Sequence, residues 1–394
     1  MRLRRGNASI GLISICMIGV ALMATPFLTA QEESPAQIRG RALALEQAGQ
    51  NAEAEEAWGA ISKADPANAE ALAHLGLLEA RQQHYDEAIQ YYRRALGIHA
   101  DLPGLQMNLG LALFKAAQFP DAIRSFSAEL TNHPGDTRLT ILLGMAHYGM
   151  KDYLVAIPYL QRALEGDPEN LTLRTTLAHS CLWSRQYQCV VKVQEEMRAL
   201  NADSAEVDLL AGEALDRMQD SDAAMKALRA AVVANPKEPN VHFALGYLLW
   251  TQSRWADAAN EFDLEIQNDP QNGKAQVYRA DSWVRQGAFA KALPELQRLA
   301  AGDPSEPLVH LDLGMAFAKA GKGEDAIREL KMAIESDPED AEPHLQLANV
   351  YRSMEKAGEK MDVANAEVDK AKRLSAANHP SLQELIDSIE NPAP

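Results

Sequence analysis

Apolar and polar positions alternate along this chain in the pattern of paired amphipathic helices. Within residues 69–102 the apolar positions recur three or four residues apart, as they do on one face of an α-helix. The first stripe consists of Ala71, Leu72, Leu75, Gly76 and Leu78. A polar turn follows at residues 82–84, and a second stripe then runs through Ala88, Tyr92, Ala95 and Leu96. The pattern predicts two helices joined by a short turn.

The two-helix pattern recurs nine times at an unbroken spacing of 34 residues, from Pro35 to Asp340. The eighth place of each unit is Gly or Ala: Ala42, Gly76, Gly110, Gly144, Ala178, Gly212, Gly246, Ala280 and Gly314. The twentieth place is small in every unit but the fifth: Ala54, Ala88, Ala122, Ala156, Val190, Ala224, Ala258, Ala292 and Ala326. A fixed period of this length predicts a solenoid, in which each unit packs only on its neighbours.

Small residues at places eight and twenty have a steric reason. Two antiparallel helices meet there, and a large side chain at Ala88 or Ala326 would overpack the crossing at a cost of about 1–3 kcal/mol. Pro occupies place 32 in seven units: Pro66, Pro134, Pro168, Pro236, Pro270, Pro304 and Pro338. It is expected to end the second helix, because it lacks an amide donor and disfavours helix in the preceding residue.

The pattern changes after residue 340. Residues 341–375 begin as a tenth unit, with Leu345, Leu347, Ala348 and Tyr351, but a charged extension lengthens its turn. Residues 376–394 contain a last short apolar stripe, Leu382, Leu385, Ile386 and Ile389, which Ser381 can cap. Terminal repeats must hide an open apolar face, so we expect this stretch to form a capping helix followed by a tail.

The amino terminus is typical of an export signal. Arg2, Arg4 and Arg5 precede an apolar stretch from Ile10 to Met23, and residues 28–30 form a small-residue cleavage site. Residues 1–30 are therefore expected to be a signal peptide, with residues 31–34 as a short linker. The alternative is an uncleaved membrane anchor over residues 8–30. Both interpretations place the body of the chain outside the cytoplasm, either periplasmic or secreted.

Net charge narrows the range of partners. The chain carries 38 Lys and Arg against 55 Asp and Glu, a formal net charge of −17. A body this acidic repels nucleic acid and anionic lipid headgroups at long range, so we expect neither nucleic-acid binding nor membrane contact beyond an N-terminal anchor.

The units resemble the tetratricopeptide repeat family. That family has a large apolar residue before the small eighth place, here Leu75, Leu109, Leu143, Leu177, Leu245 and Leu313. It also has an aromatic residue or Leu at place 24, here Trp58, Tyr92, Phe126, Leu160, Leu228, Phe262, Leu296 and Leu330. The resemblance implies an all-α fold: a right-handed superhelical solenoid of about ten helix-turn-helix repeats with a concave ligand-binding groove. The chain is similar to bacterial exported proteins of this family.

The same resemblance implies which side chains line the groove. In the family they come from set places of each first helix. Carried onto this chain, those places give Met107, Leu111, Phe114, Ile141, Met145, Tyr148, Trp183, Phe243, Tyr247 and Trp250 as candidate partner-binding residues. Aromatic residues and Met are common at binding hot spots. Glu213 and Asp216 fall on the same face and would suit a basic residue in the partner. The competing interpretation is that these side chains pack between repeats or form a solvated acidic face.

The fifth unit, residues 171–204, departs most from the pattern and holds Cys181 and Cys189. These cysteines lie on facing sides of its two helices. In an exported protein they either form a disulfide or remain two buried free thiols.

No pattern of a catalytic centre accompanies the repeats. The sequence lacks HExxH, a phosphate loop and GxSxG, and its histidines are not at metal-ligand spacing, so we predict no enzyme activity, no cofactor and no metal site. We expect a non-catalytic scaffold of the cell envelope that binds a peptide or a partner protein in the groove. The alternatives are a homodimeric structural scaffold and a carrier of an apolar small molecule or lipid.

Overall fold

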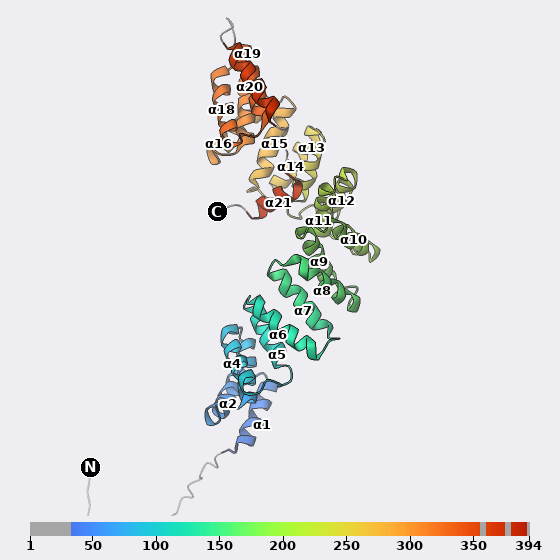
Figure 1. Cartoon of the computed structure of the whole chain (residues 1–394), viewed down its shortest axis with the longest axis vertical. Helices are drawn as coiled ribbons and strands as arrows, with labels where there is room; N and C mark the ends of the chain where they lie inside the picture. Colours follow the sequence, from blue (N-terminus) through green and yellow to red (C-terminus); the bar gives the residue numbers. More distant parts are fainter. Residues whose placement is uncertain (1–32, 355–359, 375–379, 392–394) are drawn as a thin grey trace, which may run out of the picture.

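The computed structural model describes residues 33–354, 360–374 and 380–391, and every regular element in these ranges is an α-helix. Ten helix pairs follow one another, and a single helix ends the chain (Figure 1). The first helices of the repeats are α1 (Pro35–Gln47), α3 (Ala69–Arg81), α5 (Leu105–Lys115), α7 (Thr137–Gly149), α9 (Leu171–Trp183), α11 (Ala205–Arg217), α13 (Val241–Thr251), α15 (Gly273–Arg285), α17 (Pro307–Lys319) and α19 (Ala341–Met354).

The second helices pack antiparallel to these. They are α2 (Asn51–Ala64), α4 (Tyr85–Ile98), α6 (Phe119–Asn132), α8 (Tyr153–Gly166), α10 (Tyr187–Ala199), α12 (Ser221–Ala234), α14 (Trp255–Asn268), α16 (Phe289–Gly302), α18 (Gly323–Ser336) and α20 (Met361–Arg373). The last helix is α21 (Leu382–Glu390).

A sharp turn separates the two helices of each repeat. The fifteenth place of the first nine repeats has a positive φ, between 56° and 78°. The residues are Gly49, Gln83, Ala117, Lys151, Arg185, Gln219, Ser253, Gly287 and Gly321. A left-handed residue just after a helix ends it and reverses the chain. Short polar side chains start several of the first helices: Asn68, Asn170, Ser204 and Asn272 each accept a hydrogen bond from the backbone three residues on.

The helices of a repeat cross where the small residues lie. A methyl group added to Gly110 would stand 2.5 Å from Cε1 of Phe126, and one added to Gly76 would stand 2.8 Å from Cε1 of Tyr92. Both aromatic rings sit at place 24 of the same repeat and are buried. The absence of a side chain at place eight therefore makes room for the large side chain at place 24.

First helices form one continuous surface along the molecule. Each helix packs on the next, and in the described residues the close contacts that skip one helix join first helices of adjacent repeats, such as α9 with α11 and α11 with α13. The first helices therefore lie on the concave side of the solenoid, which we call the inner surface. The all-α solenoid predicted from the sequence is confirmed (Figure 1).

The last helix lies elsewhere than expected. The sequence suggested a cap on the open end of the tenth repeat, but α21 packs on α11, α13 and α15, the first helices of repeats 6–8. Figure 1 shows α21 midway along the molecule, apart from α19 and α20. Its apolar stripe covers the inner surface there.

The tenth repeat is present as α19 and α20, on either side of residues 355–359. The expected signal peptide or anchor, residues 1–30, lies outside the described residues. Within the part of the chain that the structure describes, no helix is both long and apolar enough to span a bilayer.

Candidate functional site

The candidate partner-binding residues divide into two groups along the inner surface. The first group lies on α5, α7 and α9 of repeats 3–5, and we call it the open segment: Met107, Leu111, Phe114, Ile141, Met145, Tyr148 and Trp183. The second group lies on α11 and α13 of repeats 6 and 7, and we call it the covered segment: Glu213, Asp216, Phe243, Tyr247 and Trp250.

Apolar side chains of the open segment remain accessible to solvent. Leu111 is 37% exposed, and the other six are half-buried. Ile141, Met145 and Tyr148 also pack against the central core, so each presents part of its surface inward and part outward. These positions combine inter-repeat packing with an apolar surface that a partner can reach.

Aromatic rings gather at the end of the open segment. The Trp183 ring lies 4.8 Å from the ring of Tyr153 and 6.0 Å from that of Tyr148, measured between centroids. His179 lies 4.8 Å from Trp183, and its Nε2 is 2.7 Å from a carboxylate oxygen of Glu206. That contact lowers the pKa of Glu206, mainly through the hydrogen bond from His179. The cluster joins repeats 4, 5 and 6 beside the covered segment.

Four of the five residues of the covered segment are closed to solvent, and Asp216 is half-buried. Phe243 is fully buried, and Tyr247, Trp250 and Glu213 are each no more than 3% exposed. Residues 241–250 of α13 are all buried, so this helix has no free face. In the structure these aromatic side chains do not line an open groove, because α21 and the neighbouring repeats cover them; that they bind a partner stays a prediction.

Trp250 belongs to a polar chain that links repeats 7, 8 and 10. Its indole Nε1 donates to a carboxylate oxygen of Asp281, and Asp281 also accepts from Nε of Arg285 at 3.1 Å. Arg285 in turn makes two hydrogen bonds of 3.0 Å to Glu342 on α19. The bidentate contact fixes the guanidinium plane. Trp250 thus helps to hold repeats 7, 8 and 10 together and is also a member of the covered segment.

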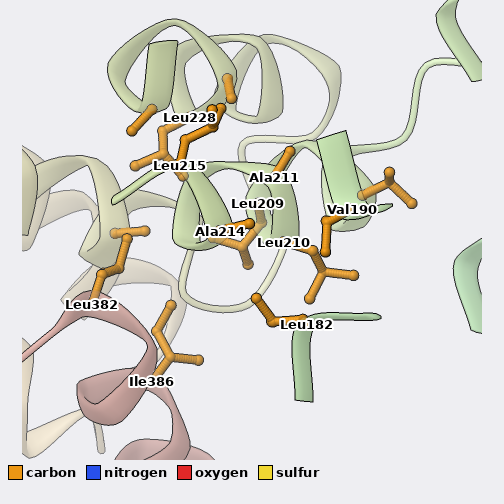
Figure 2. Close-up of a cluster of buried hydrophobic side chains, with 14 of the residues drawn as sticks. Leu182, Val190, Leu209, Leu210, Ala211, Ala214, Leu215, Leu228, Leu382 and Ile386 are labelled. Carbon is orange, nitrogen blue, oxygen red and sulfur yellow. The ribbon is translucent and has the colours of Figure 1, made fainter. Parts of the chain in front are cut away.

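Apolar contact is the main feature of the α21 interface. Leu382, Leu385 and Ile386 are each at most 5% exposed and belong to the same core cluster as Leu209, Ala214 and Tyr247. Figure 2 shows Leu382 and Ile386 reaching from α21 toward Leu209 and Ala214 on α11. Burying a Leu or Ile side chain is worth about 1.5–3 kcal/mol.

Polar contacts hold the first turn of α21. The carboxylate of Asp216 accepts from the backbone N–H of Leu382 at 3.2 Å, and the Tyr247 hydroxyl donates to the carbonyl oxygen of Pro380. A carboxylate at a helix N-terminus is favoured by the helix dipole and by the free N–H groups. Ser381 and Glu384 complete a capping box in the same turn.

The far end of α21 is held by side chains. Nδ2 of Asn240 donates to Glu390 at 3.2 Å, and Arg217 lies 3.4 Å from Glu384. Arg217 was missed by reasoning from the sequence. The available signal was the apolar stripe of α21 with its Ser381 cap, which shows that the helix needs an apolar partner surface but not which one.

An acidic cavity of about 140 Å³ lies between α21 and the helices beneath it. Five carboxylates line it: Glu206, Glu213, Glu238, Asp387 and Glu390. Burial raises the pKa of Glu213 well above its usual range, and the nearby charges of Glu390, Asp387 and Asp216 raise it further. Burial also raises the pKa values of Asp216, Asp387 and Glu390.

The two cysteines of the fifth repeat are joined. Cys181 of α9 and Cys189 of α10 form a disulfide in the structure, with their Cα atoms 5.8 Å apart. Of the two alternatives from the sequence, the structure has the bonded form. In the same repeat, Gln194 stands where the other units have an aromatic residue or Leu, and its amide donates to Asp208 of the next repeat at 2.5 Å.

Curated relatives match only part of their own length. The Drosophila melanogaster protein O-mannosyl-transferase Tmtc3 is 31% identical over 107 residues, 27% of this chain and 12% of that protein. Subunit 3 of the anaphase-promoting complex of Schizosaccharomyces pombe is 22% identical over 144 residues, 36% of this chain and 22% of that protein. The chain thus spans less than a quarter of the length of either relative.

Solved structures are similar at low sequence identity. MamA from Desulfovibrio magneticus RS-1 is 19% identical, with a TM-score of 0.37, over 43% of this chain and 94% of that one. The tetratricopeptide domain of P58(IPK) is 15% identical, with a TM-score of 0.30, over 82% of this chain and 99% of that one.

Family models agree with the repeat boundaries along most of the chain. Models described as tetratricopeptide repeat match residues 39–103, 107–170, 209–273 and 284–350, more than half of the sequence in all. These segments cover the helix pairs of repeats 1–4, 6, 7 and 9, together with α16 of repeat 8 and most of α19 of repeat 10. With its 34-residue period and its inner surface of first helices, the chain belongs to the tetratricopeptide repeat family.

Proposed function

We propose that this chain is an exported, non-catalytic scaffold that holds a segment of a partner protein against its inner surface. The observation that carries the proposal is α21 itself. A helical segment of nine residues already sits on this surface, with Leu382, Leu385 and Ile386 buried. Its first turn is hydrogen-bonded to Asp216, and the residue before its N-cap, Pro380, to Tyr247. A surface that accommodates a helix in this way has the shape and the polar groups to bind one from another protein.

The open segment is the part of the surface that a partner reaches first. Its half-buried Met, Leu and aromatic side chains continue from repeat 3 to the edge of α21, and these residue types are enriched at binding hot spots. Export is supported by the signal-like residues 1–30 and by the Cys181–Cys189 disulfide, since disulfides persist in oxidising compartments.

The test removes apolar surface from the open segment without breaking the core. We expect the double variant Leu111→Ser and Met145→Ser to recover about tenfold less partner than the native chain in quantitative co-purification from the source cells. The matched control is Leu154→Ser with Val233→Ser, which removes two apolar side chains, 61% and 84% exposed, from second helices. Circular dichroism checks that both variants keep their helix content.

The outcome separates the alternatives. Equal loss of partner in both double variants would contradict binding at the inner surface. A native chain that light scattering shows to be a dimer, and that becomes monomeric only in the Leu111 and Met145 variant, would instead support the homodimeric scaffold. An apolar molecule retained in a native mass spectrum and lost in that variant would support the carrier.

A further inference from the structure

The helix that covers repeats 6–8 repels part of the surface that it covers. α21 has three acidic side chains, Glu384, Asp387 and Glu390, and no basic one. Two of them, Asp387 and Glu390, line the 140 Å³ cavity together with Glu206, Glu213 and Glu238 of the solenoid. Among the residues that line this cavity, His179 is the single base, and its Nε2 is already 2.7 Å from Glu206.

Glu213 is the most deeply buried of these carboxylates. It is 3% exposed, lines the cavity, and makes no hydrogen bond or ion pair to another residue that the structure describes. A buried carboxylate without a partner is costly, and a buried carboxylate with a hydrogen-bonded cation is much less so. The side chain that the cavity lacks is therefore a Lys or an Arg.

Several contacts that place α21 do not depend on the exact identity of its side chains. Asp216 binds a backbone N–H of the first turn, which any helix offers, and Tyr247 binds the backbone carbonyl of Pro380, two residues before the helix begins. The apolar contacts require only apolar side chains at positions i, i+3 and i+4, here Leu382, Leu385 and Ile386. Apart from the contacts of Glu384 with Arg217 and of Glu390 with Asn240, position and orientation are thus set by general features of an amphipathic helix, and the charge mismatch is confined to Asp387 and Glu390.

We propose that the covered segment is a receptor for an amphipathic helix of a partner protein, with Leu or Ile at the spacing of α21 and a Lys or Arg at the place of Asp387 or Glu390. α21 occupies this receptor until such a helix displaces it. The inference rests on the proposed function, and it adds the chemistry of the partner and an internal competitor.

Charge gives the partner helix its advantage. A cation facing Glu213 in the cavity would form a charge-assisted hydrogen bond where α21 brings a second carboxylate. α21 has the compensating advantage of being tethered, since a short tether gives an effective concentration on the order of millimolar. Displacement therefore needs a partner that both matches the apolar spacing and supplies the missing positive charge.

The test uses labelled peptides of residues 380–391 and the full chain. One peptide has the native sequence and the other carries Asp387→Lys and Glu390→Lys. We expect fluorescence anisotropy to show the lysine peptide binding at least about tenfold more tightly than the native one. In the Glu213→Gln chain, checked for native helix content, the ratio of the two affinities should fall at least about threefold.

A third peptide controls for general attraction to an acidic protein. It carries Ser388→Lys, at a position that is exposed and does not line the cavity. If this peptide gained as much affinity as the lysine peptide, or if Glu213→Gln left the ratio unchanged, the proposed chemistry would be overturned. Equal affinity of the native and lysine peptides would overturn it as well, while leaving the scaffold function to the Leu111 and Met145 experiment.

A second measurement within the chain does not require Glu213 to be changed. Asp387→Lys in the full protein should raise the hydrogen-exchange protection of α21 amides about tenfold, whereas Ser388→Lys should leave it within about twofold. Lower protection in the Asp387→Lys chain would contradict the inference. A native dimer that dissociates when the native peptide is added would assign the receptor to α21 of a second copy and also overturn it.

Discussion

Individual positions in this solenoid differ sharply in what they tolerate. At place eight the helices of a repeat are so close that the Cβ of an ordinary residue meets the side chain at place 24, as between Gly110 and Phe126. Elsewhere a glycine has free space around it: a methyl group on Gly59, in the middle of α2, would meet nothing within 4 Å. Residue type alone therefore does not say how a glycine contributes.

Two glycine substitutions of the same kind should have opposite effects. Gly110→Ala forces the buried Phe126 ring to move, so we expect it to lower the free energy of unfolding by about 1–3 kcal/mol. Gly59→Ala removes a flexible residue from a helix interior and should raise it by about 0.5–1 kcal/mol. Urea titrations followed by circular dichroism would measure both, and a gain in stability for Gly110→Ala would refute the close-packed crossing.

Much of the fold at this scale could be predicted because the contacts that determine it are local. Gly110 and Phe126 are sixteen positions apart, as are the other place-8 and place-24 pairs, so one 34-residue unit contains its own crossing. The side chains of α13 could not be predicted in the same way. The repeat pattern places Phe243 and Tyr247 on the inner face whether that face is open or covered. Which of the two holds depends on α21, a helix more than 130 residues further along the chain.

Among the elements, α21 is the one whose place the sequence left undetermined. Its stripe of Leu382, Leu385 and Ile386 requires an apolar partner, and both the end of repeat 10 and the inner surface of repeats 6–8 offer one. Hydrogen bonds from Leu382 to Asp216 and from Asn240 to Glu390 fix it on the inner surface. Those partners lie 166 and 150 residues away along the chain, beyond any local pattern.

Docking of α21 should depend on pH. Burial raises the pKa values of four carboxyls at the interface: Glu213, Asp216, Asp387 and Glu390. A carboxyl with a raised pKa contributes its full stabilisation below its ordinary pKa and loses it as pH rises through the raised value. Glu206 and Glu384 act in the opposite direction, because hydrogen bonds from His179 and from the backbone of Ser381 lower their pKa values.

The four carboxyls with raised pKa values include the deeply buried Glu213, so their effect should outweigh that of Glu206 and Glu384. We therefore expect α21 to dock more strongly at about pH 5 than at about pH 8, with roughly tenfold greater hydrogen-exchange protection of its amides. Hydrogen exchange, corrected for intrinsic rates, would measure this difference in protection. Arg217 and Tyr247 also face α21, but each stays in one charge state between these pH values. Glu213→Gln should reduce the difference. Stronger docking at the higher pH would show that Glu206 and Glu384 dominate instead.

Over the whole molecule, α21 divides the solenoid into regions of different cooperativity. The buried core is continuous from α8 to α15 and includes α21, whereas repeats 1–3 rely on smaller clusters of their own. In repeat proteins stability is a sum over units and nearest-neighbour interfaces. A helix that bridges α11, α13 and α15 adds a contact outside that scheme and ties three repeats together.

Releasing α21 should therefore speed hydrogen exchange only in the middle of the chain. Leu385→Asp places a charge at a side chain that is 5% exposed, and we expect it to speed exchange of α11 and α13 amides about tenfold or more. Amides of α3 and α4 should keep their rates, and so should every helix in the exposed control Val233→Asp. Uniform acceleration along the whole chain would mean that the solenoid unfolds as a single unit.

The long reach of α21 also sets the order in which the molecule can be completed during its synthesis. Asp216 leaves the ribosome 166 residues before Leu382, and at usual translation rates this interval is roughly 10–30 s. For most of that time Phe243 and Tyr247 have been made but lack their cover, while repeats 1–4 can already be packed. The centre of the molecule, though translated before the last repeats, is thus the last part to be finished, and nascent chains expose an apolar patch that the mature protein hides.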